Sequence, residues 1–437
     1  MQMMELADNT LEQLNKKTDH AEIYIEQAET LDVNIQNDEI NYAEEQKILG
    51  IGIRVIKDQK QGYAYTTQIK NVENTINQAI KNAKLNTKDE NNCLPEKTTE
   101  YPIIKNQNDQ KTRETDLEEI IDLTKILIDT TKEQKCNPTA GGFASLNSHK
   151  LILNTNNISI EEKQTRCSAS IEVNTPDNET ISNAYHYDTQ IALKNINPFK
   201  IAENTCKLAL DSRSPKKIET QDLPVILDYE ASASLLGTFM AALTSENKQR
   251  QRSIFKDKEN QQVTTEEFTL YDDGTMPNAL KTSVSDDEGI PSQKTVLIKD
   301  GVLKNFIYDT YHAKKENKIS TANAVRNSYT STPSLGFTNL QLNFKETTPI
   351  NSISEGLIVN NVIGAHTANP ITGDFSVEVS NAFKIENGER TYPIKKAMIS
   401  GNIFDIMKTT TKATKTTRQL SSYITPKILI KKIRVIG

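Results

Sequence analysis

The chain has 437 residues, of which 36% are apolar and 25% are charged. At roughly 150 residues per domain, this length predicts two or three domains, each with its own core. The sequence contains no apolar run near the roughly 20 residues that a membrane-spanning helix needs, and its start lacks the basic and apolar segments of a secretory signal. We therefore expect a soluble, cytoplasmic protein with no membrane partner.

The formal net charge is −6, which disfavours nucleic acid as a partner unless basic residues are grouped on one surface. One such group exists, because every charged side chain from residue 408 onward is basic: Lys408, Lys412, Lys415, Arg418, Lys427, Lys431, Lys432 and Arg434. We interpret this group as a solvated strand edge and loop rather than as a binding site for an anionic partner.

The four cysteines are widely spaced, with no CxxC pair and no histidine at a zinc-finger distance. This pattern indicates reduced thiols, most of them buried as small apolar side chains. The residues concerned are Cys93, Cys136, Cys167 and Cys206.

The first segment, residues 1–85, has the pattern of an α+β unit. Ile23 and Ile25 share one face of a strand, whereas Leu31, Val33 and Ile35 share another. The other expected elements are a helix over 6–14, a tight turn at 37–38, two strands joined at 58–62, and a helix over 72–83.

Residues 86–113 are rich in Asn, Lys, Thr and Asp and show no sustained period, which predicts a linker. A second α+β unit then follows over 114–215, with helices expected over 115–134 and 201–210 and strands between them. The order helix, strands, helix thus occurs twice, but the sequence identity between the two halves is too weak to assert a duplication.

The third segment, residues 222–437, is predicted to be a larger and mainly antiparallel β domain with a long helix. That helix begins at Asp228, a good N-cap, and is expected to continue to about Ser253. Hairpin turns are predicted at Asp300-Gly301 and at Asn387-Gly388. The fold class predicted for the whole chain is therefore α+β, with two smaller units followed by this domain.

Short motifs offer little catalytic chemistry. The stretch Gly50 to Gly52 alternates within a strand and indicates close backbone packing rather than nucleotide binding. The five histidines are scattered over all three segments, and no two have a helical ligand spacing. There is also no nucleophile elbow, no SxxK pair and no P-loop.

Clustered carboxylates at Asp286, Asp287 and Glu288 are candidates for a divalent-cation site or an acid/base pair. The alternating acids of an EF-hand are missing, so we favour a structural turn or a partner-facing acidic loop. If the chain had a peptidase site of its own, these three residues and His366 would be the first candidates.

Turn-forming residues from Asn369 to Ser376 predict a shaped loop between two strands. A plain hairpin connection is one interpretation, and an element that lines a cleft, which the family resemblance described below implies, is equally open. The candidate substrate-binding residues are Asn369, Thr372, Gly373, Asp374 and Phe375.

Several longer stretches together resemble the TldD/PmbA family. The C-terminal matches include EASASLLGTFMAAL, QRQRSIF, LYDDGTMPNAL, NPITGDFSVEVSNAFKIENGE and MISGNIFDIMK, and residues 21–67 are similar to the first domain of the family. The similarity covers nearly the whole chain in the same order. It implies a three-part α+β protein on the PmbA (TldE) side of the family, which has also been called a modulator of DNA gyrase.

In the TldD branch, the helix that starts at Asp228 carries an HExxxH motif whose histidines bind zinc and whose glutamate activates water. Alignment places Leu236, Gly237 and Ala241 at these three positions. A cysteine ligand near the C-terminus is also missing, since the last cysteine is Cys206. The resemblance therefore implies no metal and no catalytic residue in this chain, with zinc held by a TldD-type partner.

The resemblance further implies a heterodimer in which this chain shapes the cleft of a cytosolic metallopeptidase. We expect it to bind an unfolded peptide or small protein as an extended strand, at a sheet edge offered by the strands of 290–400. Two alternatives remain open. One is a stand-alone homodimeric binding module, and the other is a metallopeptidase with an unrecognised site.

Overall fold

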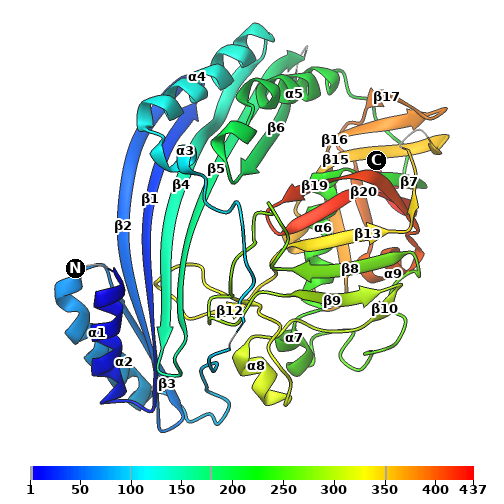
Figure 1. The fold of residues 1–437 in the computed structure, drawn as a ribbon. Helices are drawn as coiled ribbons and strands as arrows, with labels where there is room; N and C mark the ends of the chain where they lie inside the picture. Colours follow the sequence, from blue (N-terminus) through cyan, green and yellow to red (C-terminus); the bar gives the residue numbers. More distant parts are fainter. Residues whose placement is uncertain (1–2, 99, 178–179, 350–351) are drawn as a thin grey trace.

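The computed structural model describes residues 3–98, 100–177, 180–349 and 352–437. It has two bodies, a long curved sheet with helices near each of its ends and a β-rich body packed against the opposite face of that sheet (Figure 1). None of the described helices is long and apolar enough to cross a membrane.

Six long strands form the first sheet, in the order β3-β2-β1-β4-β5-β6. Their bounds are His20–Gln36 (β1), Glu39–Lys57 (β2), Lys60–Thr66 (β3), Asn137–Asn154 (β4), Ser159–Asp177 (β5) and Thr180–Gln190 (β6). The helices and helical turns are Met3–Asn15 (α1), Ile69–Asn71 (η1), Val72–Leu85 (α2), Gln110–Glu114 (α3), Leu117–Glu133 (α4), Leu193–Asn195 (η2) and Pro198–Asp211 (α5). The helices α1, α2, α4 and α5 lie within a few residues of their predicted positions.

The helix, strands, helix order that the sequence predicts twice is present in the structure. The first run is α1, β1 to β3 and α2, and the second is α4, β4 to β6 and α5. The two runs join where β1 pairs antiparallel with β4 over residues 22–36. Strands from 1–85 and from 114–215 therefore share one sheet.

Two separate cores lie on the same face of this sheet. At one end Ile23 and Ile25 pack with α1 and α2, and at the other Leu31, Val33 and Ile35 pack with α4 and α5. The prediction that these two sets point to different faces is wrong, because β1 is one continuous strand and residues of the same parity share a face. The opposite face of the sheet is thereby left for the second body.

The second body is built around a 12-stranded sheet with the order β10-β9-β8-β13-β20-β18-β16-β15-β7. An additional pairing of β20 with β7 closes the last strands of this order into a ring. Ten of its strands are Gln221–Leu227 (β7), Phe268–Asp273 (β8), Lys294–Lys299 (β9), Val302–Leu303 (β10), Leu340–Phe344 (β13), Glu355–Ile363 (β15), Asp374–Glu386 (β16), Met398–Asn402 (β18), Lys412–Leu420 (β19) and Tyr423–Ile436 (β20).

The remaining elements of this body are short. The strands are Ala324–Val325 (β11), Ser334–Leu335 (β12), Glu346–Thr347 (β14) and Glu389–Pro393 (β17). The helices and helical turn are Tyr229–Ala241 (α6), Ser245–Gln249 (α7), Thr310–Lys315 (α8), Ala365–Thr367 (η4) and Ile403–Thr409 (α9). Among the described residues of this body, most strand pairs are antiparallel, as predicted, and three are parallel: β13 with β20, β14 with β19, and β15 with β7.

The predicted long helix is shorter in the structure. It starts after Asp228 as expected but ends at Ala241, and α7 follows after a break. At the break, the Ser245 amide donates to the Ile307 carbonyl (3.1 Å) and the Ile307 amide donates to Leu243 (3.0 Å). Pairing with a segment distant in sequence thus takes the hydrogen-bonding groups that a continuing helix would need.

Both predicted hairpin turns in this body are confirmed. Asp300 and Gly301 join β9 to β10, and Asn387 and Gly388 join β16 to β17. All four residues have positive φ, which is the conformation of a type I′ turn.

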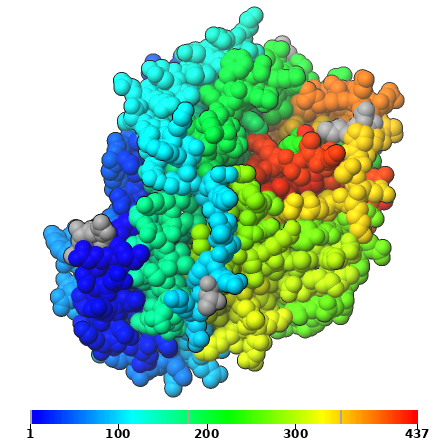
Figure 2. All heavy atoms as spheres, viewed as in Figure 1, coloured from blue at the N-terminus to red at the C-terminus, as the bar shows by residue number. Residues whose placement is uncertain are grey.

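Residues 86–98 and 100–113, from the predicted linker, run along the junction between the two bodies (Figure 2). Their side chains contact the second body at several points. Tyr311 Oη donates to Asp89 (2.7 Å), and Tyr101 Oη donates to the Gly289 carbonyl (2.9 Å). This segment therefore fills part of the interface instead of only connecting two elements.

Gly50 and Gly52 lie under a tyrosine from the other body. A Cβ on Gly50 would come within 1.9 Å of the Tyr329 ring, and a Cβ on Gly52 within 2.1 Å of the Tyr63 hydroxyl. The Tyr329 amide also donates to Glu26 (3.2 Å). The close backbone packing predicted for the glycine stretch is confirmed, and the element that packs there is the loop between β11 and β12.

We expect Gly50→Ala to destabilise the protein by about 2 kcal/mol, because its methyl group would displace the Tyr329 ring from the sheet. Gly237→Ala is the matched control. Its Cβ would have only the Tyr423 hydroxyl nearby, at 3.6 Å, and alanine favours the helix by about 1 kcal/mol. Urea unfolding of both variants measures the difference, and equal stability of the two would contradict this account of the interface.

Candidate functional site

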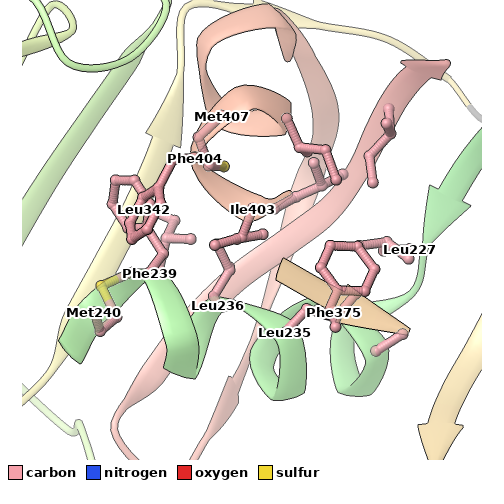
Figure 3. Close-up of a cluster of buried hydrophobic side chains, with 14 of the residues drawn as sticks. Leu227, Leu235, Leu236, Phe239, Met240, Leu342, Phe375, Ile403, Phe404 and Met407 are labelled. Carbon is pink, nitrogen blue, oxygen red and sulfur yellow. The ribbon is translucent and has the colours of Figure 1, made fainter. Parts of the chain in front are cut away.

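Helix α6 is the first place to look for catalytic chemistry. Leu236 is only 2% exposed and belongs to the main core of the second body. Figure 3 shows it pointing from α6 toward Ile403, with Phe239 on the same helix close by. This position is filled by apolar packing.

The two other aligned positions also lack a donor atom for a metal. Gly237 and Ala241 are half-buried, and neither carries a polar side chain. Zinc needs nitrogen, sulfur or carboxylate ligands, so leucine, glycine and alanine do not fit it. Within the described ranges, no three His, Cys, Asp or Glu side chains are grouped so that they could hold a metal ion.

The acidic cluster at 286–288 lies between the two bodies, with Asp286 and Glu288 buried and Asp287 partly exposed. Arg54 of β2 binds Glu288 (2.9 Å) and Glu22 of β1 (2.6 Å), and Arg326 also contacts Glu22. Lys150 of β4 binds Asp287 (3.1 Å). Glu288 and Asp287 therefore join the second body to the first sheet through ion pairs.

Asp286 holds its own turn together. Its carboxylate accepts hydrogen bonds from the amides of Glu288 (3.0 Å), Ile290 (2.9 Å) and Ala324 (3.2 Å). Burial, followed by repulsion from Glu288, raises its pKa well above the usual range of an aspartate. These contacts are those of a structural turn, which is the interpretation that the sequence favours over a divalent-cation site.

Strand β5 adds a second row of contacts across the interface. Glu162 accepts from the Val284 amide (3.0 Å), Gln164 donates to the Thr282 carbonyl (3.3 Å), and Arg166 donates to the Leu280 carbonyl. Alternate residues of β5 thus bind alternate main-chain groups of 280–284, as expected from side chains on one face of a strand.

The loop of candidate substrate-binding residues is a compact turn at the start of β16. Asn369 Oδ1 accepts from the amides of Ile371 (2.9 Å) and Thr372 (3.2 Å), and Asn402 donates to Asp374 (2.9 Å). Gly373 has φ +87, and a Cβ there would meet the Phe404 ring at 2.4 Å.

Within this loop, Asn369, Thr372 and Asp374 are exposed, whereas Phe375 is buried in the core. None of these residues lines either of the two cavities described below.

The structure does not bring the histidines together. Four have polar partners: His20 with Asn156 (3.3 Å), His149 with Glu161 (2.7 Å), His186 with Glu230 (3.4 Å) and His312 with Asp309 (2.8 Å). His366 lies exposed in η4 and does not belong to the Asp286–Glu288 network. The four cysteines are free thiols, three of them buried, as expected.

A cavity of about 560 Å³ lies between the two bodies at the start of α6. Its walls come from α5, β6, α6, β15, β17, β19 and β20. Arg418 binds Glu230 (3.1 Å), and Lys427 binds Asp228 (2.7 Å). Its volume falls within the range of ligand pockets. The sequence did not single out Glu230 or His186, because Arg418, which contacts both, is distant from them in the sequence.

A second cavity of about 340 Å³ lies near the linker and is lined by α7 and α8 among others. Its carboxylates already have partners. Glu288 binds Arg54, Asp309 binds His312, and Asp89 accepts from Tyr311. The charged groups of both cavities are thus paired, and the cavity beside α6 is the better candidate for binding because it is the larger of the two.

The C-terminal basic group is largely neutralised. Six of its eight residues lie within salt-bridge distance of a carboxylate: Lys408 with Asp405, Lys412 with Glu346, Arg418 with Glu230, Lys427 with Asp228, and both Lys432 and Arg434 with Asp222. A surface of this kind offers little free positive charge to a polyanion.

Comparison with known families identifies the class of protein. Models of PmbA/TldA metallopeptidases match the chain in three parts: domain 1 at residues 21–83, the central domain at 110–213 and the C-terminal domain at 220–437. The chain therefore belongs to the PmbA/TldD family, as the sequence motifs indicate.

Individual relatives agree with this assignment. A Methanocaldococcus jannaschii protein of uncharacterised function is 37% identical over 366 residues, which cover 82% of this chain and 83% of the relative. The PmbA metalloprotease homologue of Haemophilus influenzae is 24% identical, with 95% of this chain and 92% of the relative covered.

Two solved structures share the fold and confirm the predicted α+β class. TldE from Thermococcus kodakarensis has a TM-score of 0.91 at 24% identity, and the match covers 99% of this chain and 100% of TldE. A proposed modulator of a DNA gyrase from Thermotoga maritima has a TM-score of 0.90 at 22% identity, with 99% of each chain covered.

We expect Glu22→Gln to destabilise the protein by about 3 to 5 kcal/mol, because it leaves Arg54 and Arg326 buried without their shared carboxylate. Unfolding in urea measures this loss. Limited proteolysis within 86–113 should also become faster as the interface loosens. The control is Glu161→Gln, an exposed carboxylate whose loss should cost less than about 1 kcal/mol. A Glu22→Gln protein as stable as this control would show that the network contributes little to docking.

Proposed function

We propose that this chain is the non-catalytic, substrate-binding subunit of a cytosolic zinc metallopeptidase complex of the TldD/TldE type, acting on unfolded peptides or small proteins. The observation that carries the proposal is the packing of Leu236 in an apolar core, where the resemblance places a zinc-binding histidine. With Gly237 and Ala241 at the other two positions, none of the three aligned positions of α6 has a side chain that could bind zinc or activate water.

In this proposal a TldD-type partner supplies the zinc and the general base, while this chain binds and positions substrate. The cavity of about 560 Å³ beside α6 supports a binding role. It presents both acidic and basic side chains, so it suits a peptide with mixed polarity better than a uniformly charged polymer.

A free sheet edge also supports binding of an extended chain. Among the described residues of 290–400 the edge strands are short, since β10, β11, β12 and β14 have two residues each and β17 has five. A longer edge is present on β2, because residues 39–50 pair with β1 and, in the part of the chain described, with no strand on the other side. Main-chain groups on such an edge can add a peptide as a further strand.

Nucleic acid remains an unfavoured partner in this proposal. The net charge is −6, and most of the basic C-terminal group is paired with carboxylates. If relatives affect DNA gyrase, processing of a peptide or a toxin-related protein is a more economical explanation than binding to DNA.

The test is reconstitution with a cognate TldD-type chain. We expect the isolated chain to bind an unfolded peptide without cleaving it and to contain no stoichiometric zinc. The mixture should form a complex that cleaves the peptide faster than the TldD-type chain alone. A chelator should abolish cleavage but leave peptide binding by this chain unchanged, because its binding groups are not metal ligands.

Two outcomes would replace the proposal. If the isolated chain binds peptide as a homodimer and neither associates with the TldD-type chain nor changes its activity, it is a stand-alone binding module. Chelator-sensitive cleavage by the isolated chain, together with stoichiometric zinc, would instead indicate a metal site formed by other residues.

A further inference from the structure

A small crevice of about 170 Å³ lies between β5 and the segment 280–287, away from the cavity beside α6. Its lining includes Gln164, Arg166, Lys281, Thr282 and Ser283. The row of hydrogen bonds between β5 and 280–284 fixes both walls. The hydrogen bonds of the interface therefore define the shape of the crevice.

Four cations line the crevice, and two of them already have acidic partners. Lys150 binds Asp287 (3.1 Å) and Glu162 (3.2 Å), and Arg326 binds Glu22. These ion pairs belong to the interface network described above.

Arg166 and Lys281 have no such partner, since neither forms a salt bridge with a carboxylate among the described residues. Arg166 donates to the Leu280 carbonyl, but its Nε is buried and has no hydrogen-bond partner in the described part of the chain. Two cations side by side without a counter-ion are unfavourable in a partly desolvated site.

The pKa values follow from the same geometry. Burial lowers the pKa of Arg166. Partial burial lowers the pKa of Lys281, and repulsion from Arg166 lowers it further, although Asp287 acts in the opposite direction. A bound anion would relieve both effects.

The carboxylates that line the crevice do not serve as this counter-ion. Asp287 is engaged by Lys150 and by the Arg326 amide (2.8 Å). Asp286 accepts three main-chain hydrogen bonds, and burial raises its pKa. The unmatched positive charge thus stays at Arg166 and Lys281.

We propose that Arg166 and Lys281 bind a carboxylate group of the peptide, either its C-terminal carboxylate or the side chain of an aspartate or glutamate. This proposal rests on the proposed function for the identity of the occupant. The guanidinium of Arg166 supplies donors that match a carboxylate, and Lys281 is exposed at the entrance. The site would anchor one point of an extended peptide.

The experiment uses the full-length chain and three labelled alanine pentapeptides in fluorescence anisotropy. The first has a free C-terminal carboxylate, the second is amidated, and the third is amidated with one internal glutamate. We expect the first peptide to bind at least about tenfold more tightly than the second, as one charge-assisted interaction provides. If the third peptide binds as tightly as the first, the site also accepts the carboxylate of an acidic side chain.

Lys281→Gln should remove this preference, since the exposed side chain can be changed without disturbing the fold. Lys163→Gln is the matched control, because Lys163 lies on the same strand as Arg166 but on its opposite face and is exposed. Arg166→Lys keeps the charge and should retain part of the preference. A preference that persists in Lys281→Gln, or that is absent from the unmodified protein, would overturn the proposal.

Inorganic phosphate separates this proposal from the proposed function. We expect phosphate to raise the thermal unfolding midpoint of the unmodified protein and of Lys163→Gln, but not of Lys281→Gln. If no peptide binds while this phosphate effect is present, the oxyanion site stands and the substrate-binding role fails. If peptides bind with no preference for carboxylate and phosphate has no effect that depends on Lys281, the oxyanion site fails and the substrate-binding role stands.

Discussion

The buried ion pairs of Glu22, Arg54, Glu288 and Arg326 determine how the two bodies of this protein fit together. Each charge has lost most of its water, so only the correct docking geometry supplies compensating partners. Buried ion pairs of this kind add little to the net free energy of folding. They do favour one relative orientation of the two bodies, because any other orientation leaves a buried charge unpaired. The network therefore defines the interface on which the cavities depend.

Both candidate binding features are consequences of this docking. The larger cavity takes its walls from helix α5 and strand β6 of the first body and from α6, β19 and β20 of the second body. The crevice at Arg166 and Lys281 likewise uses one wall from each body. Neither site exists within a single body, so a change in the interface would alter both together.

Local sequence patterns were sufficient for most elements but not for the interface. The helices α1, α2, α4 and α5 follow from their apolar spacing, and the two hairpins follow from Asp-Gly and Asn-Gly pairs. The end of α6 could not be predicted, because it depends on Ile307, which is distant in sequence. The shared face of Ile23 and Leu31 required knowing that β1 continues without a break.

The same limit applied to the candidate site. Charged Glu22 and Arg54 stand among apolar strand residues, which indicates buried charges with partners, but their partners at 288 and 326 are far away in sequence. What local sequence did reveal was the chemistry of α6. Because the core has closed around Leu236 with Phe239 and Ile403, a single change to histidine would place one imidazole in an apolar site without the other ligands. Zinc chemistry on α6 would thus require several simultaneous substitutions. The proposed complex requires none, because its TldD-type chain supplies the zinc ligands and this chain binds substrate.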